Sequence, residues 1–170
     1  MNKIISVVAL MGLSACLGSG SSDGTPTVPI DLTPDQPDVA MNTEFGTLLN
    51  GMRMGNDATY DSRIGRAAQL HANDMFERNY FSVVIEGDPN GRDIGDRVTA
   101  EGYTWSEIVQ LIAQGDYTIE GALAEFDNSG NCGGGGQDLC ITDSFLTDFG
   151  IAKAGAGDGQ KWVLVLAAPG

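Results

Sequence analysis

Histidine is nearly missing from this sequence: among 170 residues, only His71 carries an imidazole. A metal site that needs two histidines from one chain is therefore excluded. Basic residues are also few, nine against 23 acidic ones, which gives a net charge of −14. Such an acidic surface repels nucleic acid and anionic lipid headgroups. We therefore expect no nucleic-acid partner, and we interpret the acidity, which is spread along the chain, as a solubility feature.

Long hydrophobic runs are absent too. The longest apolar stretch near the start, IISVVALMGL, has ten residues, whereas a membrane-spanning helix needs about 20. It follows the short basic segment MNK, as the apolar part of a secretory signal peptide does. The next residues, Leu13-Ser14-Ala15-Cys16, have the small residue and cysteine of a bacterial lipobox. The sequence predicts a lipoprotein signal peptide over residues 1–15 and lipid attachment at Cys16.

The segment after this cysteine predicts a tether on a membrane. Residues 16–43 are rich in Gly, Ser, Pro, Thr and Asp and have no helical or strand period, a composition typical of flexible linkers. Leu17, and not an aspartate, follows the cysteine, which favours the outer membrane in Gram-negative sorting. We expect an exported lipoprotein on the outer membrane or the periplasmic face of a Gram-negative envelope. Residues 44–170 then form one domain.

Cysteine is also scarce. Apart from the lipobox residue there are only Cys132 and Cys140, on either side of four consecutive glycines. In an oxidising compartment such a pair predicts a disulfide. Zinc would need about four ligands, and no further His or Cys is near. A phosphate-binding loop usually carries a lysine, but no basic residue occurs between Arg97 and Lys153. The disulfide is the favoured interpretation.

Periodicity predicts the elements of the domain. The first predicted helix begins at Thr43, its expected cap, and continues into GTLLNGMRMGN. A turn is predicted at residues 56–61, and Asp61 or Ser62 then caps a helix over residues 63–79. A further helical turn ends at Gly102, and Thr118 is the expected cap of a helix that ends near Phe126. In the second helix, Ile64, Ala68, His71 and Met75 share one apolar face. Residues 149–154 and 162–167 predict a C-terminal antiparallel hairpin, and the apolar segment 106–115 fits a helix or a strand. Together they predict an α+β sandwich.

Read together, four segments resemble the bacterial SCP domains of the CAP superfamily, which also holds cysteine-rich secretory, venom-antigen and pathogenesis-related proteins. They are LLNGMR, TYDSRIGRAAQLHANDMFERNYFS, DPNGRDIGDRVTAEGYTW and FGIAKAG…KWVLVLA. The similarity runs from about Phe45 to Ala167. It implies a CAP-like α–β–α sandwich with a small antiparallel sheet. It also implies a cleft with two histidines and two acidic residues, which often holds a divalent metal.

This sequence departs from the family at those cleft positions. Val83 stands where the family has histidine after Tyr-Phe-Ser, and Gln110 replaces the glutamate of a Gly-Glu-Asn segment. The second family histidine corresponds to Gly136 or Gln137. These four residues are the candidate degenerate cleft, and we expect neither a metal nor another cofactor there.

His71 is interpreted as a packed structural residue, because it lies on the apolar helix face. The leading hypothesis is a lipid-anchored envelope protein with a degenerate SCP domain. It would be a non-enzymatic module that binds a protein partner or a small apolar ligand. The alternative is an envelope hydrolase that uses His71 with a nearby carboxylate. A third possibility is a structural spacer on a tether.

Overall fold

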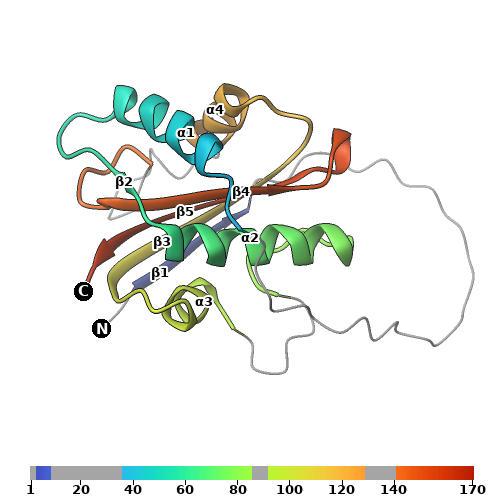
Figure 1. Cartoon of the computed structure of the whole chain (residues 1–170), viewed down its shortest axis with the longest axis horizontal. Coiled ribbons are helices and arrows are strands. Elements are labelled where there is room, and N and C mark those ends of the chain that lie inside the picture. The colour runs from blue at the N-terminus through green and yellow to red at the C-terminus, as the bar shows by residue number, and fades with distance from the viewer. Residues whose placement is uncertain (1–2, 9–35, 86–91, 129–140) are drawn as a thin grey trace, which may run out of the picture.

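The computed structural model describes residues 3–8, 36–85, 92–128 and 141–170, and it has three layers (Figure 1). The helices are α1 (Val39–Met52), α2 (Ser62–Glu77), α3 (Ile94–Ala100) and α4 (Ile119–Asn128). The strands are β1 (Lys3–Val8), β2 (Thr59–Tyr60), β3 (Trp105–Gln114), β4 (Asp148–Ala154) and β5 (Lys161–Pro169). Helices α1 and α4 cover one face of the sheet, and α2 and α3 cover the other. The predicted α–β–α sandwich is confirmed.

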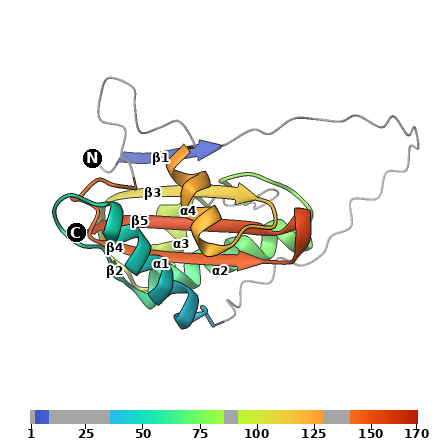
Figure 2. The same cartoon turned by 90° about the horizontal axis from the view of Figure 1, so that it is seen from above.

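The sheet has the strand order β1-β3-β5-β4-β2. Its three central strands are antiparallel, with β5 between β3 and β4, while β1 and β2 are added in parallel at the two sides. Figure 2 shows β1 next to β3, at one side of the sheet. The predicted C-terminal hairpin is therefore β4 and β5, joined by a turn that includes a short 3₁₀ segment, Gly157–Gly159.

Strand β5 runs through the core of the domain and is buried from Lys161 to Ala168. Because helices cover both faces of the sheet, such a strand has apolar side chains at successive positions. Side chains toward α1 and α4 come from Trp162, Leu164 and Leu166. Those toward α2 and α3 come from Val163, Val165 and Ala167. The same two-sided burial explains why the segment now seen as β3 had no clear period.

Helix α1 begins earlier than predicted. Asp38 caps it by accepting a hydrogen bond from the Met41 amide at 2.9 Å, whereas the expected cap, Thr43, donates its hydroxyl to the Val39 carbonyl inside the helix. Residues 39–43 therefore belong to the folded domain and not to the tether. Met41 in the first turn of this helix is buried, which the polar composition around it does not indicate.

Asn42 joins α1 to the sheet. Its side chain is fully buried; its amide nitrogen donates to the Ile151 carbonyl at 2.9 Å, and its oxygen accepts from the Ile151 amide at 2.8 Å. Strand β2 pairs only with Asp148 and Phe149 of β4, so it does not reach Ile151. The Asn42 side chain takes the place of a neighbouring strand there.

Helix α2 lies very close to β4. It is capped by Asp61, one of the two predicted caps, and ends at Glu77. The four residues predicted to share its apolar face are all fully buried. The contact with β4 is made by backbone: a Cβ atom added to Gly150 would lie 2.3 Å from the amide nitrogen of Gly65. Two glycines therefore set the distance between this helix and the sheet.

Local signals set the other helix ends. Asp93 and Asp96 form a capping box at the start of α3, and Gly102, with φ +82°, lies in the turn that follows it. Thr118 caps α4 by accepting from the Gly121 amide at 3.1 Å. Strand β1 lies inside the predicted signal peptide, and β2 lies where a turn was predicted. No helix in the part of the chain that the structure describes is long and apolar enough to cross a membrane.

Candidate functional site

Two of the predicted cleft residues meet in the structure. Gln110 is fully buried on β3, and Val83 lies in the segment that follows α2. The Gln110 amide nitrogen donates to the Val83 carbonyl at 3.3 Å. The other two predicted cleft residues, Gly136 and Gln137, lie outside the described residues, as do Cys16, Cys132 and Cys140. The site can therefore be built from Val83 and Gln110 and the residues around them.

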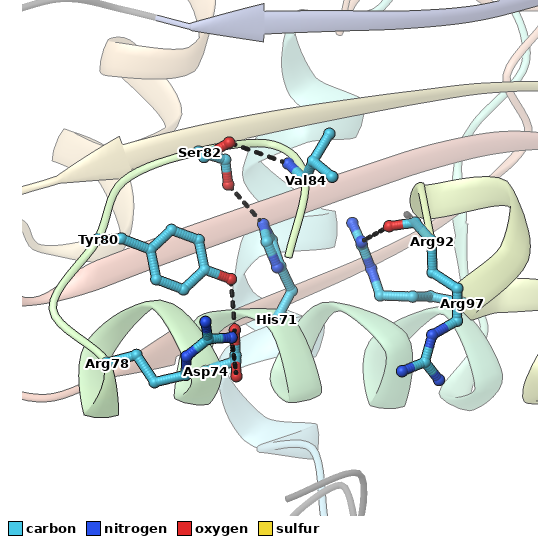
Figure 3. Close-up of polar contacts among 8 residues, drawn as sticks. All are labelled: His71, Asp74, Arg78, Tyr80, Ser82, Val84, Arg92 and Arg97. Atoms are coloured by element: carbon cyan, nitrogen blue, oxygen red, sulfur yellow. Dashed lines mark hydrogen bonds and ion pairs between the residues drawn. The ribbon is translucent and has the colours of Figure 1, made fainter. Parts of the chain in front are cut away.

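Arg97 of α3 is the central group of this site. Its guanidinium donates to the Gln110 side-chain oxygen and, at 3.3 Å, to the Val83 carbonyl. It also donates to the Arg92 carbonyl at 3.1 Å (Figure 3). The side chain is 4% exposed, and burial lowers its pKa to about 10. The group is therefore a buried cation at neutral pH that ties α3, β3 and the segment after α2 together.

Arg97 was not among the residues predicted for the site. A signal was available: Arg97 lies three residues after Ile94, which is the spacing of one helix face, and Ile94 is buried. An arginine on the buried face of an amphipathic helix needs internal acceptors. Which acceptors these are depends on β3 and on the segment near Val83, and no local pattern reports that.

This arrangement does not fit a divalent metal ion. Val83 offers only an isopropyl group as a side chain, and the Gln110 oxygen already accepts from a guanidinium. A metal ion beside that oxygen would be repelled by the charge of Arg97 at short range. Across residues 36–85, 92–128 and 141–170, no three His, Cys, Asp or Glu side chains are grouped so that they could hold a metal.

His71 lies behind this site and is fully buried. Its Nε2 donates to the Ser82 carbonyl at 2.8 Å, which fixes the proton on that nitrogen (Figure 3). Its Nδ1 is buried and has no hydrogen-bond partner in the part of the chain that the structure describes. Burial, followed by the nearby charge of Arg97, lowers the pKa of the imidazole to about 3. The prediction of a packed, structural histidine is confirmed.

Asp74 is the acidic side chain drawn near His71 in Figure 3, and it has other partners. The Tyr80 hydroxyl donates to it, and Arg78 forms an ion pair with it at 3.3 Å. Burial, reinforced by this carboxylate, raises the pKa of the Tyr80 hydroxyl. Asp74 does not orient the His71 ring, whose second nitrogen is unpaired. The hydrolase hypothesis required an exposed His71, and complete burial of the ring removes that basis.

The buried imidazole should make stability depend on pH. The pKa is 6.5 for a free histidine and about 3 in the folded chain, so between these values the unfolded chain binds the additional proton. Above pH 6.5 this histidine does not lower the free energy of unfolding. From pH 6.5 down to about pH 3, the free energy of unfolding falls by about 1.4 kcal/mol per pH unit. Urea unfolding from pH 7 to pH 4 should show this slope. In H71Q the free energy of unfolding should change less with pH than in the parent. Parallel curves for the two proteins would contradict the assignment of His71 as a buried, neutral group.

The three layers define the class of fold, a mixed α/β sandwich. The chain belongs to the Cysteine-rich secretory protein family (CAP), whose sequence model matches residues 50–166. Comparison with curated proteins gives no match.

Two solved structures show the same fold. One is an extracellular protein containing an SCP domain from Bacillus anthracis, with a TM-score of 0.57 and 18% identity. The match covers 74% of this chain but only 39% of that protein. The other is an outer surface protein of Borrelia burgdorferi, with a TM-score of 0.63 and 10% identity over 81% of this chain and 100% of that one.

Proposed function

We propose that this protein is a lipid-anchored cell-envelope protein whose CAP domain has lost the metal site of its family and acts as a binding module. The observation that carries the proposal is the hydrogen bond that the Arg97 guanidinium donates to the side-chain oxygen of Gln110. The positively charged guanidinium therefore lies beside Gln110, the residue that corresponds to a glutamate of the family. The location is supported by the lipobox that ends at Cys16 and by the two structural relatives, which are an extracellular protein and an outer surface protein.

Metal analysis tests the loss of the site. The purified chain, dialysed against micromolar zinc and then against metal-free buffer, should retain far less than one zinc per chain by elemental mass spectrometry. H71Q is the matched variant, because it removes the single histidine. Stoichiometric zinc in the parent chain would overturn the proposal, and its loss in H71Q would identify His71 as a ligand.

The anchor has a separate test. Cys16→Ala should move the protein from the membrane fraction to the soluble fraction, because the thiol that carries the lipid is gone. Cys132→Ala is the control, since it removes a cysteine outside the lipobox and should leave membrane attachment unchanged. Membrane association of Cys16→Ala at the parental level would show that the anchor is assigned wrongly.

A further inference from the structure

A pocket of ≈ 280 Å³ lies between α2 and α3, next to Arg97. Its wall is mostly apolar, with two arginines and one glutamate. The lining residues are Ala67, Leu70, Ile85, Arg92, Arg97, Ala100 and Glu101. Small-molecule sites usually have about 300–1,000 Å³, so this pocket suits a ligand smaller than a sterol or a lipid.

The charges around the pocket are unbalanced. The carboxylate of Glu101 is paired with Arg66 at 2.7 Å. Among the described residues, Arg97 donates only to neutral oxygens, and its Nε is buried without an acceptor there. Within the described ranges no carboxylate lies at ion-pair distance from it; Asp93 and Asp74 act on it only from farther away. The charge of Arg97 is therefore not neutralised locally.

An unneutralised cation in such surroundings attracts an anion. Removing a charge from water is costly unless an opposite charge is near, and Coulomb attraction is strong where the surroundings are apolar. The chain as a whole is strongly acidic, with a net charge of −14. This local positive potential therefore contrasts with the overall charge, and the apolar wall beside it can cover a short hydrocarbon group.

We propose that the pocket between α2 and α3 binds a small organic anion, with its negative group toward Arg97 and a short apolar group against Leu70 and Ile85. This inference rests on the proposed function, because it gives the binding module a class of ligand. The anionic group can be a carboxylate or a phosphate ester, since both suit a guanidinium.

Calorimetry on the full chain, purified in a neutral detergent, tests the ligand class. The probes are acetate, butanoate, hexanoate and butyl phosphate, with butanamide as the uncharged analogue of butanoate. At least one anion should bind at millimolar concentration or below, and butanoate at least about tenfold more tightly than butanamide. The relative affinities of butanoate and butyl phosphate identify the preferred anionic group. Equal binding of butanoate and butanamide, or no binding of any anion, overturns the proposal.

Variants locate the site without disturbing Arg97, whose removal would also release Val83 and Gln110. Ala100 lines the pocket and is exposed, so A100F should fill its mouth and weaken anion binding at least about tenfold. Ala124 is exposed on α4, in the other helix layer, and A124F should bind as the parent does. Unchanged affinity in A100F overturns the location. The zinc content of the same samples, and the membrane fraction of the cells that express them, report separately on the proposed function.

Discussion

Replacing Gly150 with valine should prevent the domain from folding. Even the first added carbon would lie 2.3 Å from the Gly65 amide nitrogen and 2.6 Å from the Gly65 Cα. These are backbone atoms in the first turn of α2, and they cannot move aside as a flexible side chain can. Overpacking usually costs about 1–3 kcal/mol, and a clash with helix backbone should exceed this. The loss is a large part of the roughly 5–15 kcal/mol that stabilises a typical protein.

Circular dichroism and urea unfolding measure this effect in G150A and G150V. The alanine variant should lose more than about 3 kcal/mol, and the valine variant should not give a cooperative transition. G159A is the matched control, because a Cβ at Gly159 meets nothing within 4 Å. Stability of G150A within about 0.5 kcal/mol of the parent would show that α2 can move away from the sheet.

Replacing Asn42 with leucine should be the second severe change. Leucine is similar in size, but it cannot pair with Ile151, whose amide and carbonyl groups would remain buried without partners. Each unsatisfied buried group costs about 1–3 kcal/mol, so N42L should lose roughly 3 kcal/mol or more. N42D separates the two bonds, because its carboxylate can accept from the Ile151 amide but cannot donate to the carbonyl.

Urea unfolding at pH 7 is the measurement, and the exposed Asn56 provides the control. Asn56 donates only a long bond of 3.4 Å to Ser144, so N56A should change stability by less than about 0.5 kcal/mol. If N42L unfolded like N56A, the Asn42 side chain would not be completing the sheet at Ile151.

The helices and the C-terminal hairpin could be predicted because their signals are local. Asp61 and Thr118 cap the helices that follow them, and the 3.6-residue spacing placed His71 on a buried face. Strand β3 had no resolvable period, because side chains from both of its faces are buried. Its assignment depends on helices that lie on opposite sides of the sheet, and a window of sequence does not contain them.

The candidate site was only partly predictable. Val83 and Gln110 came from a resemblance, and the structure brings them together. Arg97 was missed, because its acceptors come from three separate segments of the chain. Asn42 was missed for the same physical reason: its partner, Ile151, is 109 positions away. Pairings between distant segments give no periodic signal in the sequence.

The pairing of β1 with β3 has a consequence for maturation. β1 lies within the segment that a signal peptidase would remove, and it pairs with β3 from Glu107 to Ile112. Cleavage before Cys16 would turn β3 into an edge strand with unpaired backbone groups, and such edges promote strand-to-strand aggregation. Under the proposed cleavage, β1 would shield this edge in the uncleaved chain, and the cleaved chain would show faster hydrogen exchange along β3.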